Sequence, residues 1–177
     1  MADSSLFTVH LVTPERVLVS GLATEVILRT GDGDITFLAG HTPLVGTVEP
    51  GVVRVVRAEG EDDRVAVHGG FVQVEQGVED EDGTATSGTR VTLLIGVAEL
   101  AQEIDVDRAR AALESAESRL SELGGAGSRT GAGAGPAGDA EEPDAELVEA
   151  QAELLRAQVR LETVDATSGA TAGAAAG

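Results

Sequence analysis

Several residue types are missing from this chain, and each absence removes a class of chemistry. Cysteine is absent, so the sequence offers neither a disulfide framework nor a thiolate metal site, which indicates a reducing compartment. All 12 basic residues are arginine, which excludes a Walker lysine and a Schiff-base lysine. Aromatic residues make up 2% of the chain, with no Trp or Tyr, so we expect no stacking platform for bases or sugars.

Long apolar runs and a positive net charge are absent as well. No window approaches the roughly 18 consecutive apolar residues that span a bilayer, and the first residues lack a basic segment followed by an apolar run. We therefore expect no direct membrane insertion. The formal charge of -19 opposes binding to a phosphate backbone, which relies on clustered basic side chains. Nucleic acid is excluded as a partner.

The first part of the chain has the sequence pattern of β structure. Its apolar residues alternate with polar ones or run in short β-branched bursts, separated by Gly, Pro and Asp turns at intervals of roughly 8 to 12 residues. This pattern predicts an all-β sandwich or barrel as the N-terminal domain, over residues 1–100. Two acidic spacers, at 59–64 and 79–90, are expected to be surface loops.

After residue 100 the apolar spacing changes to alternating steps of three and four, which is typical of an amphipathic helix. The first predicted helix lies within 101–123, with Asp105 as its N-cap and Gly124 and Gly125 as its stop. The second lies within 144–165 and follows a proline. We expect the two helices to pack as an antiparallel hairpin.

The apolar seam of each predicted helix alternates Leu or Val with Ala, which permits close approach of the two helices. The seam positions are Val106, Ala109, Leu113, Ala116, Leu120 and Leu123 in the first helix, and Leu147, Ala150, Leu154, Ala157, Leu161 and Val164 in the second. Residues 124–143 are predicted to be a flexible Gly/Ala linker, and 166–177 a disordered tail. A hairpin of this kind buries little apolar surface, so it is a candidate mobile element.

Short motifs that suggest ligand sites are all incomplete. Gly31-Asp32-Gly33 lacks the third glycine of a dinucleotide fingerprint and precedes a strand rather than a helix. Asp32 and Asp34 lack the bidentate acid that follows the glycine of a calcium loop. The three histidines share no ligand spacing, so each is interpreted as a hydrogen-bonded structural residue. The sequence predicts no catalytic residue, no metal site and no required cofactor.

Four motifs nevertheless occur in an informative order: Gly-His-x-Pro-Leu at 40–44, Pro-Gly-Val-Val-Arg at 50–54, Gly-Gly-Phe at 69–71 and Ile-Asp-x-x-Arg-Ala at 104–109. Together with a β domain followed by a two-helix hairpin, this order resembles the epsilon subunit of the bacterial F-type ATP synthase. The resemblance omits the two low-complexity segments. It departs from the family at Ala39, where proline is common, in an acidic insertion and in a long interhelical linker.

The resemblance implies a non-catalytic rotor subunit that couples proton translocation to ATP synthesis and inhibits ATP hydrolysis. Its β domain would dock on the gamma subunit and the c-ring, and its hairpin would reach the catalytic alpha and beta subunits. The location would be peripheral, at the cytoplasmic face of the cell membrane. The expected docking residues are His41, Thr42, Pro43, Leu44, Gly69, Gly70 and Phe71.

Some bacterial members of this family bind ATP at the base of the hairpin, and the resemblance therefore implies a regulatory ATP site. It would use the helix-start motif together with arginines of the second helix, which suit bidentate contact with phosphates. The residues implied are Glu99, Ile104, Asp105, Arg108, Ala109, Arg156 and Arg160. From the residues alone, Asp105 is equally an ordinary N-cap, and the arginines can simply solvate the hairpin.

Two other functions are compatible with the sequence pattern. One is a small-ligand-binding β module with a helical oligomerisation hairpin, which predicts self-association through the Leu/Ala seams. The other is a hydrolase that uses the acid-rich loops, which predicts turnover by the isolated chain.

Overall fold

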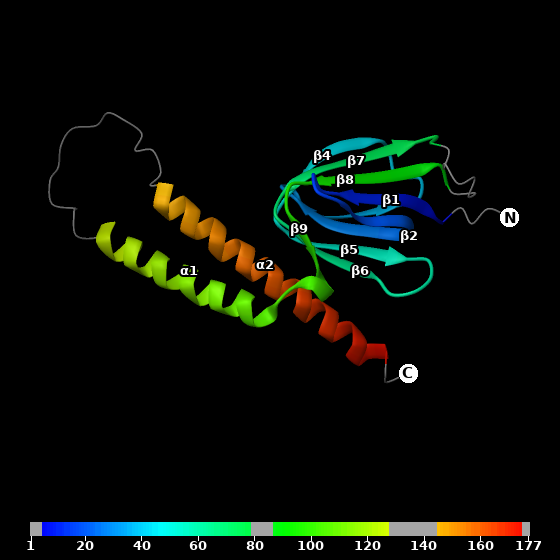
Figure 1. Cartoon of the computed structure of the whole chain (residues 1–177). Helices are drawn as coiled ribbons and strands as arrows, with labels where there is room; N and C mark the ends of the chain where they lie inside the picture. The colour runs from blue at the N-terminus through cyan, green and yellow to red at the C-terminus, as the bar shows by residue number, and fades with distance from the viewer. Residues whose placement is uncertain (1–4, 79–86, 128–144, 175–177) are drawn as a thin grey trace, which may run out of the picture.

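The computed structural model describes residues 5–78, 87–127 and 145–174 (Figure 1). A β domain comes first, and two helices follow it. The strands are β1 (Phe7–Val12), β2 (Val17–Thr30), β3 (Gly33–Leu38), β4 (Leu44–Val48), β5 (Gly51–Arg57), β6 (Asp63–Val67), β7 (Gly70–Gln76), β8 (Thr89–Ile95) and β9 (Ala98–Leu100). A single 3-10 turn, Ala101–Glu103, leads into α1 (Val106–Gly127), and α2 spans Ala145–Ala174. The predicted fold class, a β sandwich followed by a helical hairpin, is confirmed.

The strands pair in the order β4-β7-β8-β1-β2-β5-β6-β9, with β3 also paired to β2. The first half of β2 is antiparallel to β1, and its second half lies between β3 and β5, so this strand joins the two layers of the domain. In the sequence, the apolar bursts at 16–21 and 24–30 are separate, which predicts two strands in this segment. The structure instead makes one strand, in which Gly21 at φ +135 and a register shift between Ala23 and Glu25 permit a bend.

The core of the β domain lies between these layers and consists of inward-facing residues of the strands. Because side chains alternate across a strand, β5 buries Val53 and Val55, and β8 buries Val91, Leu93 and Ile95. Every buried residue of this cluster lies between residues 7 and 95. The helices therefore contribute none of the buried residues described for this core.

Helix α1 begins as the sequence predicts. The Asp105 carboxylate accepts a hydrogen bond from the Arg108 N–H at 3.0 Å, which is the N-cap contact. Gly124 and Gly125 do not stop the helix, which continues to Gly127. Each glycine reduces helix stability by only about 1 kcal/mol relative to alanine. The helix formed by the preceding turns can therefore continue past both glycines.

Helix α2 also differs from the prediction at its end. It continues to Ala174, whereas the sequence analysis ends it at residue 165 and begins a disordered tail at 166. The added segment is rich in alanine, which has the highest helix propensity. The remainder of the predicted linker, 128–143, and of the predicted tail, 175–177, lies outside the described residues.

The two helices pack through the predicted seams. Ala109 and Ala116 of α1, and Ala150 and Ala157 of α2, are at most 3% exposed, and the Leu and Val seam positions are half-buried. Across the hairpin, Arg119 Nη1 contacts Glu153 Oε2 at 2.5 Å. Figure 1 shows the end of α1 and the start of α2 projecting away from the β domain. Among the described residues, no helix is long and apolar enough to cross a membrane.

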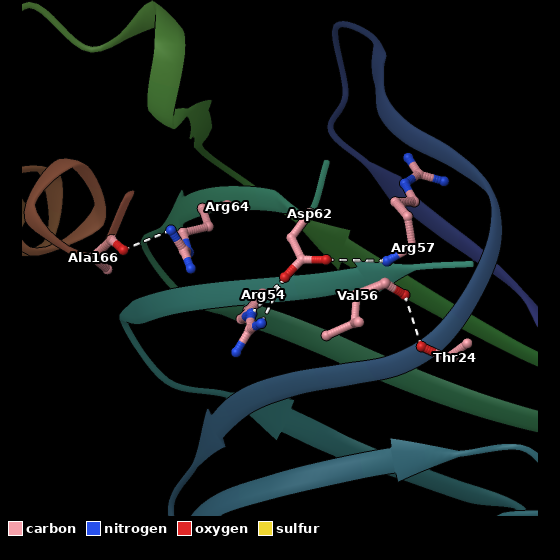
Figure 2. A network of polar contacts seen from close by, with 7 residues as sticks. All are labelled: Thr24, Arg54, Val56, Arg57, Asp62, Arg64 and Ala166. Carbon is pink, nitrogen blue, oxygen red and sulfur yellow. Dashed lines mark hydrogen bonds and ion pairs between the residues drawn. The ribbon is translucent and has the colours of Figure 1, made fainter. Parts of the chain in front are cut away.

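The base of the hairpin contacts the outer face of the β domain. A small apolar cluster joins Ala66 of β6, Ile104, Ala109 and Val159, separate from the main core. Arg64 Nη1 also donates to the Ala166 carbonyl of α2 at 2.6 Å (Figure 2). Four described residues are buried in this cluster, against 18 in the core of the β domain.

A polar network on β5 and β6 supports this contact (Figure 2). Arg54 and Arg64 are direct cross-strand partners, and two like charges in such positions repel one another. Asp62 binds Arg54 at 2.6 Å, while Arg64 turns to the Ala166 carbonyl. The network therefore places the Arg64 cation against the backbone of α2 at Ala166.

Candidate functional site

Five of the seven residues predicted for nucleotide binding meet at the junction of β9, α1 and α2. A cleft of about 270 Å³ opens there. Its lining residues are Glu99, Glu103, Asp105, Arg108, Ala109, Ala112 and Arg160. The structure thus brings together Glu99, Asp105, Arg108, Ala109 and Arg160 from the predicted set.

Some residues of the helix-start motif are buried and hold the hairpin on the β domain, and others are exposed in the cleft. Ile104 is 8% exposed and Ala109 3% exposed, and both belong to the apolar cluster that joins the hairpin to β6. Asp105 caps α1 through the Arg108 N–H. The Arg108 side chain is exposed and makes no ion pair with any described residue. It is the cation in this cleft that remains available.

Arg160 is held in place by a carboxylate of the β domain. Its Nε and Nη2 atoms contact Glu99 Oε1 at 2.8 and 2.5 Å. Both side chains are about 30% exposed, so this ion pair is only partly screened by water. Arg156 does not line the cleft, although it is close enough to affect the electrostatics of His68.

Glu103 is a cleft residue that the sequence analysis missed. Arg16, which lies between β1 and β2, binds the Glu103 carboxylate with both terminal nitrogens, Nη1 and Nη2. The distance from Nη1 to Glu103 Oε1 is 3.0 Å. This hydrogen bonding lowers the pKa of the Glu103 carboxyl below its ordinary value. No local motif marks Glu103, because its role depends on an arginine far away in the sequence. The lining carries more acids than arginines, so a phosphate must compete with Glu99 for Arg160.

The first predicted docking segment, His41 to Leu44, leads into β4 and includes its first residue. Its position is fixed by Gln76, which donates to the His41 carbonyl at 2.7 Å and to Thr89 Oγ1 at 2.9 Å. The His41 ring packs edge-on against Phe37, with ring centroids 4.8 Å apart. Thr42, Pro43 and Leu44 follow on the surface.

The second predicted docking segment, Gly69 to Phe71, leads into β7. Gly69 has φ +98, and a Cβ on Gly70 would lie 2.4 Å from the Leu94 carbonyl oxygen, so both glycines have structural roles. In the β4–β7 register Leu44 faces Val74, and Val48 faces Gly70. The two segments therefore lie at opposite ends of this strand pair and do not form one patch.

An apolar patch does lie on the outer face of this end of the sheet. Val45, Phe71 and Leu94 come from neighbouring strands β4, β7 and β8, and these residues are 73%, 58% and 50% exposed. Phe71 is the direct cross-strand partner of Leu94, and Val45 lies diagonal to Phe71. We call these three residues the apolar patch. Only Phe71 of this patch is predicted from the sequence, because strand alternation does not reveal which strands are neighbours.

No group of three or more His, Cys, Asp or Glu side chains within the described ranges could hold a metal ion. Of the three histidines, His10 and His41 are hydrogen-bonded, at 3.1 Å to Ser20 Oγ and 2.8 Å to the Thr42 carbonyl. His68 departs from the sequence interpretation, because both its ring nitrogens are buried without a hydrogen-bond partner among the described residues.

Comparison with known proteins gives matches over most of the chain. Residues 6–78 match the family model described as the beta-sandwich domain of the ATP synthase delta/epsilon chain. Residues 102–165 match the long alpha-helix domain of the same chain.

Individual relatives agree with these matches. The ATP synthase epsilon chain of Thermobifida fusca (strain YX) is 48% identical over 119 residues, which is 66% of this chain and 79% of the relative. The epsilon chain of Brevibacillus brevis is 42% identical over 118 residues, 67% of this chain and 80% of the relative. A chain in the structure of the Euglena gracilis mitochondrial ATP synthase is similar in fold, with a TM-score of 0.55 and 20% identity over 94% of this chain and 82% of that chain.

Proposed function

Because this chain belongs to the family of ATP synthase delta/epsilon chains and is a non-catalytic subunit of that complex, we propose that its β domain attaches it to the central stalk. The partners in this proposal are the gamma subunit and the c-ring, at the cytoplasmic face of the cell membrane. The observation that carries it is the apolar patch, because exposed apolar residues on adjacent strands favour burial against a partner. Because the chain belongs to this family, we no longer interpret it as a hydrolase or as an oligomerising ligand-binding module.

Substitutions on the patch test this attachment. Phe71→Ser and Leu94→Ser should each weaken binding of the purified gamma subunit, because each removes apolar surface from the interface. Val97→Ser is the matched control, since Val97 is 52% exposed but lies in the turn after β8, off the patch. Equal binding by all three variants and the parent chain would contradict attachment through the patch.

We also propose that the hairpin regulates ATP hydrolysis by moving between two positions. In one it packs on the β domain, and in the other it reaches along gamma towards the alpha and beta subunits. The small cluster at its base and its alanine-rich seam support this, because neither buries enough apolar surface to fix the hairpin strongly.

Deletion of residues 105–177 from the assembled enzyme tests the regulatory proposal. The expected result is faster ATP hydrolysis, with the enzyme still coupled to proton movement. Unchanged hydrolysis would remove the inhibitory role and leave the stalk role intact.

The third part of the proposal is a regulatory ATP site in the cleft at the hairpin base. Arg108 supplies an unpaired guanidinium and Arg160 a second one, both suited to phosphate oxygens. ATP would replace Glu99 as the partner of Arg160. Binding would then stabilise the packed hairpin, because the cleft exists only where β9, α1 and α2 meet.

Calorimetric titration of the isolated chain with ATP and magnesium tests this site. We expect saturable binding that Arg108→Ala and Arg160→Ala each weaken about tenfold or more, through loss of a charge-assisted hydrogen bond. Arg110→Ala is the control, because the Arg110 side chain is 68% exposed and lies outside the cleft. The site is refuted by an absence of saturable heat at millimolar ATP, or by equal binding in all variants.

A further inference from the structure

His68 lies at the junction between the β domain and the helical hairpin. Ala66, two residues before it, is buried against Val159 of α2, and Glu99, which pairs with Ala66 across β6 and β9, binds Arg160.

His68 follows β6, and its backbone N–H donates to the Val97 carbonyl at 3.2 Å. Its imidazole is half-buried, and neither ring nitrogen has a hydrogen-bond partner among the described residues. A buried polar group without a partner is uncommon in a folded protein. The stalk-docking and nucleotide proposals leave this residue without a role.

The charges around this ring come from both sides of the junction. Helix α2 contributes Arg160 and Arg156, and β9 contributes Glu99. The Glu99 carboxylate is already bound by Arg160 at 2.5 Å. A proton on His68 would therefore add a third cation beside two arginines, with one carboxylate to balance them.

Burial and the two arginines all disfavour the charged form of the imidazole. Loss of solvent and the nearby Arg160 lower the pKa of His68 below its ordinary value of 6.5, and Glu99 offsets this only in part. When α2 leaves the β domain, both Arg156 and Arg160 leave with it. The repulsion that the two arginines exert on a charged imidazole is then lost.

We propose that His68 is a pH-sensitive latch: the packed hairpin accommodates the neutral imidazole, and protonation of His68 favours release of α2 from the β domain. The released state binds more protons, so packing is fully favoured above about pH 6.5 and weakens as the pH falls below it. One titrating group changes the equilibrium by at most about tenfold per pH unit. This latch requires no nucleotide and does not depend on the proposed ATP site.

The absence of cysteine allows a direct test in the full chain. Glu61→Cys in the β5–β6 loop and Gln151→Cys on α2 are both at exposed positions and can carry a donor and an acceptor dye. Energy transfer between them is followed from pH 8 to pH 5.5 at fixed ionic strength, without nucleotide. This range stays above the ordinary pKa of Asp and Glu carboxyls.

The expected result is a loss of energy transfer below about pH 6.5 in the parent chain. His68→Gln and His68→Asn, which cannot titrate, should remove this loss, and His10→Gln should retain it. Circular dichroism on the same samples checks that each variant keeps its strands and helices. The latch is overturned if the parent chain shows no change down to pH 5.5, or if both folded His68 variants lose energy transfer as the parent does.

Discussion

The β domain and the helical hairpin are built from different kinds of buried residue. The domain buries large side chains such as Phe7, Phe37 and Leu93, all fully enclosed between its two layers. The fully enclosed apolar positions between the helices are alanines, with leucines only half-buried beside them. Since burial of apolar area is the main source of stability, we expect the domain to fold by itself and the hairpin to depend on contact with something else.

The contacts between the two regions are few and polar in part. One small apolar cluster, the Arg160–Glu99 ion pair and the Arg64–Ala166 hydrogen bond connect them. Such contacts can open without unfolding the β domain, because its core contains no helical residue. This difference between the regions supports our proposal that the β domain provides attachment and the hairpin provides regulation.

The largest expected effect is in the core of the β domain. Leu93→Ala should lower the free energy of unfolding by about 3 kcal/mol, because it leaves a cavity between the two layers. Leu94→Ala is the control, since this neighbour points outward and is 50% exposed. Urea unfolding followed by circular dichroism measures both. Similar losses in the two variants would contradict the assignment of inner and outer faces.

A smaller effect is expected in the hairpin seam. Ala157 is 0% exposed, so Ala157→Leu should force the helices apart at a cost of about 1–3 kcal/mol. Hydrogen exchange should become faster in α1 and α2 while the strands keep their protection. Loss of protection in the strands as well would show that the two regions unfold together.

The smallest effect is expected at the start of α1. Asp105→Ala removes the cap and should cost the helix about 1 kcal/mol. Asp107→Ala is the matched control, because its side chain is 98% exposed and does not cap the helix. Thermal unfolding of the hairpin, followed at a helical wavelength, should separate the two variants. A larger loss for Asp107→Ala would contradict the cap.

Local pattern predicts much of this fold because period and caps are local properties. Alternation identified the strand segments, and the three-and-four spacing identified both seams and the Asp105 cap. The continuity of β2 was not predicted, since a bend at Gly21 and a break look alike in sequence. The end of α2 at Ala174 was missed because glycine and serine in the last segment suggested a tail.

The residues of the candidate site were likewise predictable only where the signal is local in the sequence. The family resemblance at the helix-start motif implied that Asp105, Arg108 and Ala109 share a site with Arg160, and all four line the cleft. Glu103 and His68 were missed, because their surroundings come from strands and helices distant in sequence. The parallel pairing of β1 with β8 is equally invisible in a local pattern, although it connects the two ends of the β domain.

Binding of the isolated β domain to the stalk tests the central claim most directly. Residues 1–100 and the full chain would be titrated separately against the purified gamma subunit, with circular dichroism confirming that the fragment is folded. If the β domain is the anchor, the fragment binds gamma with the same dissociation constant as the full chain. A folded fragment that fails to bind gamma, while the full chain binds, would contradict the account.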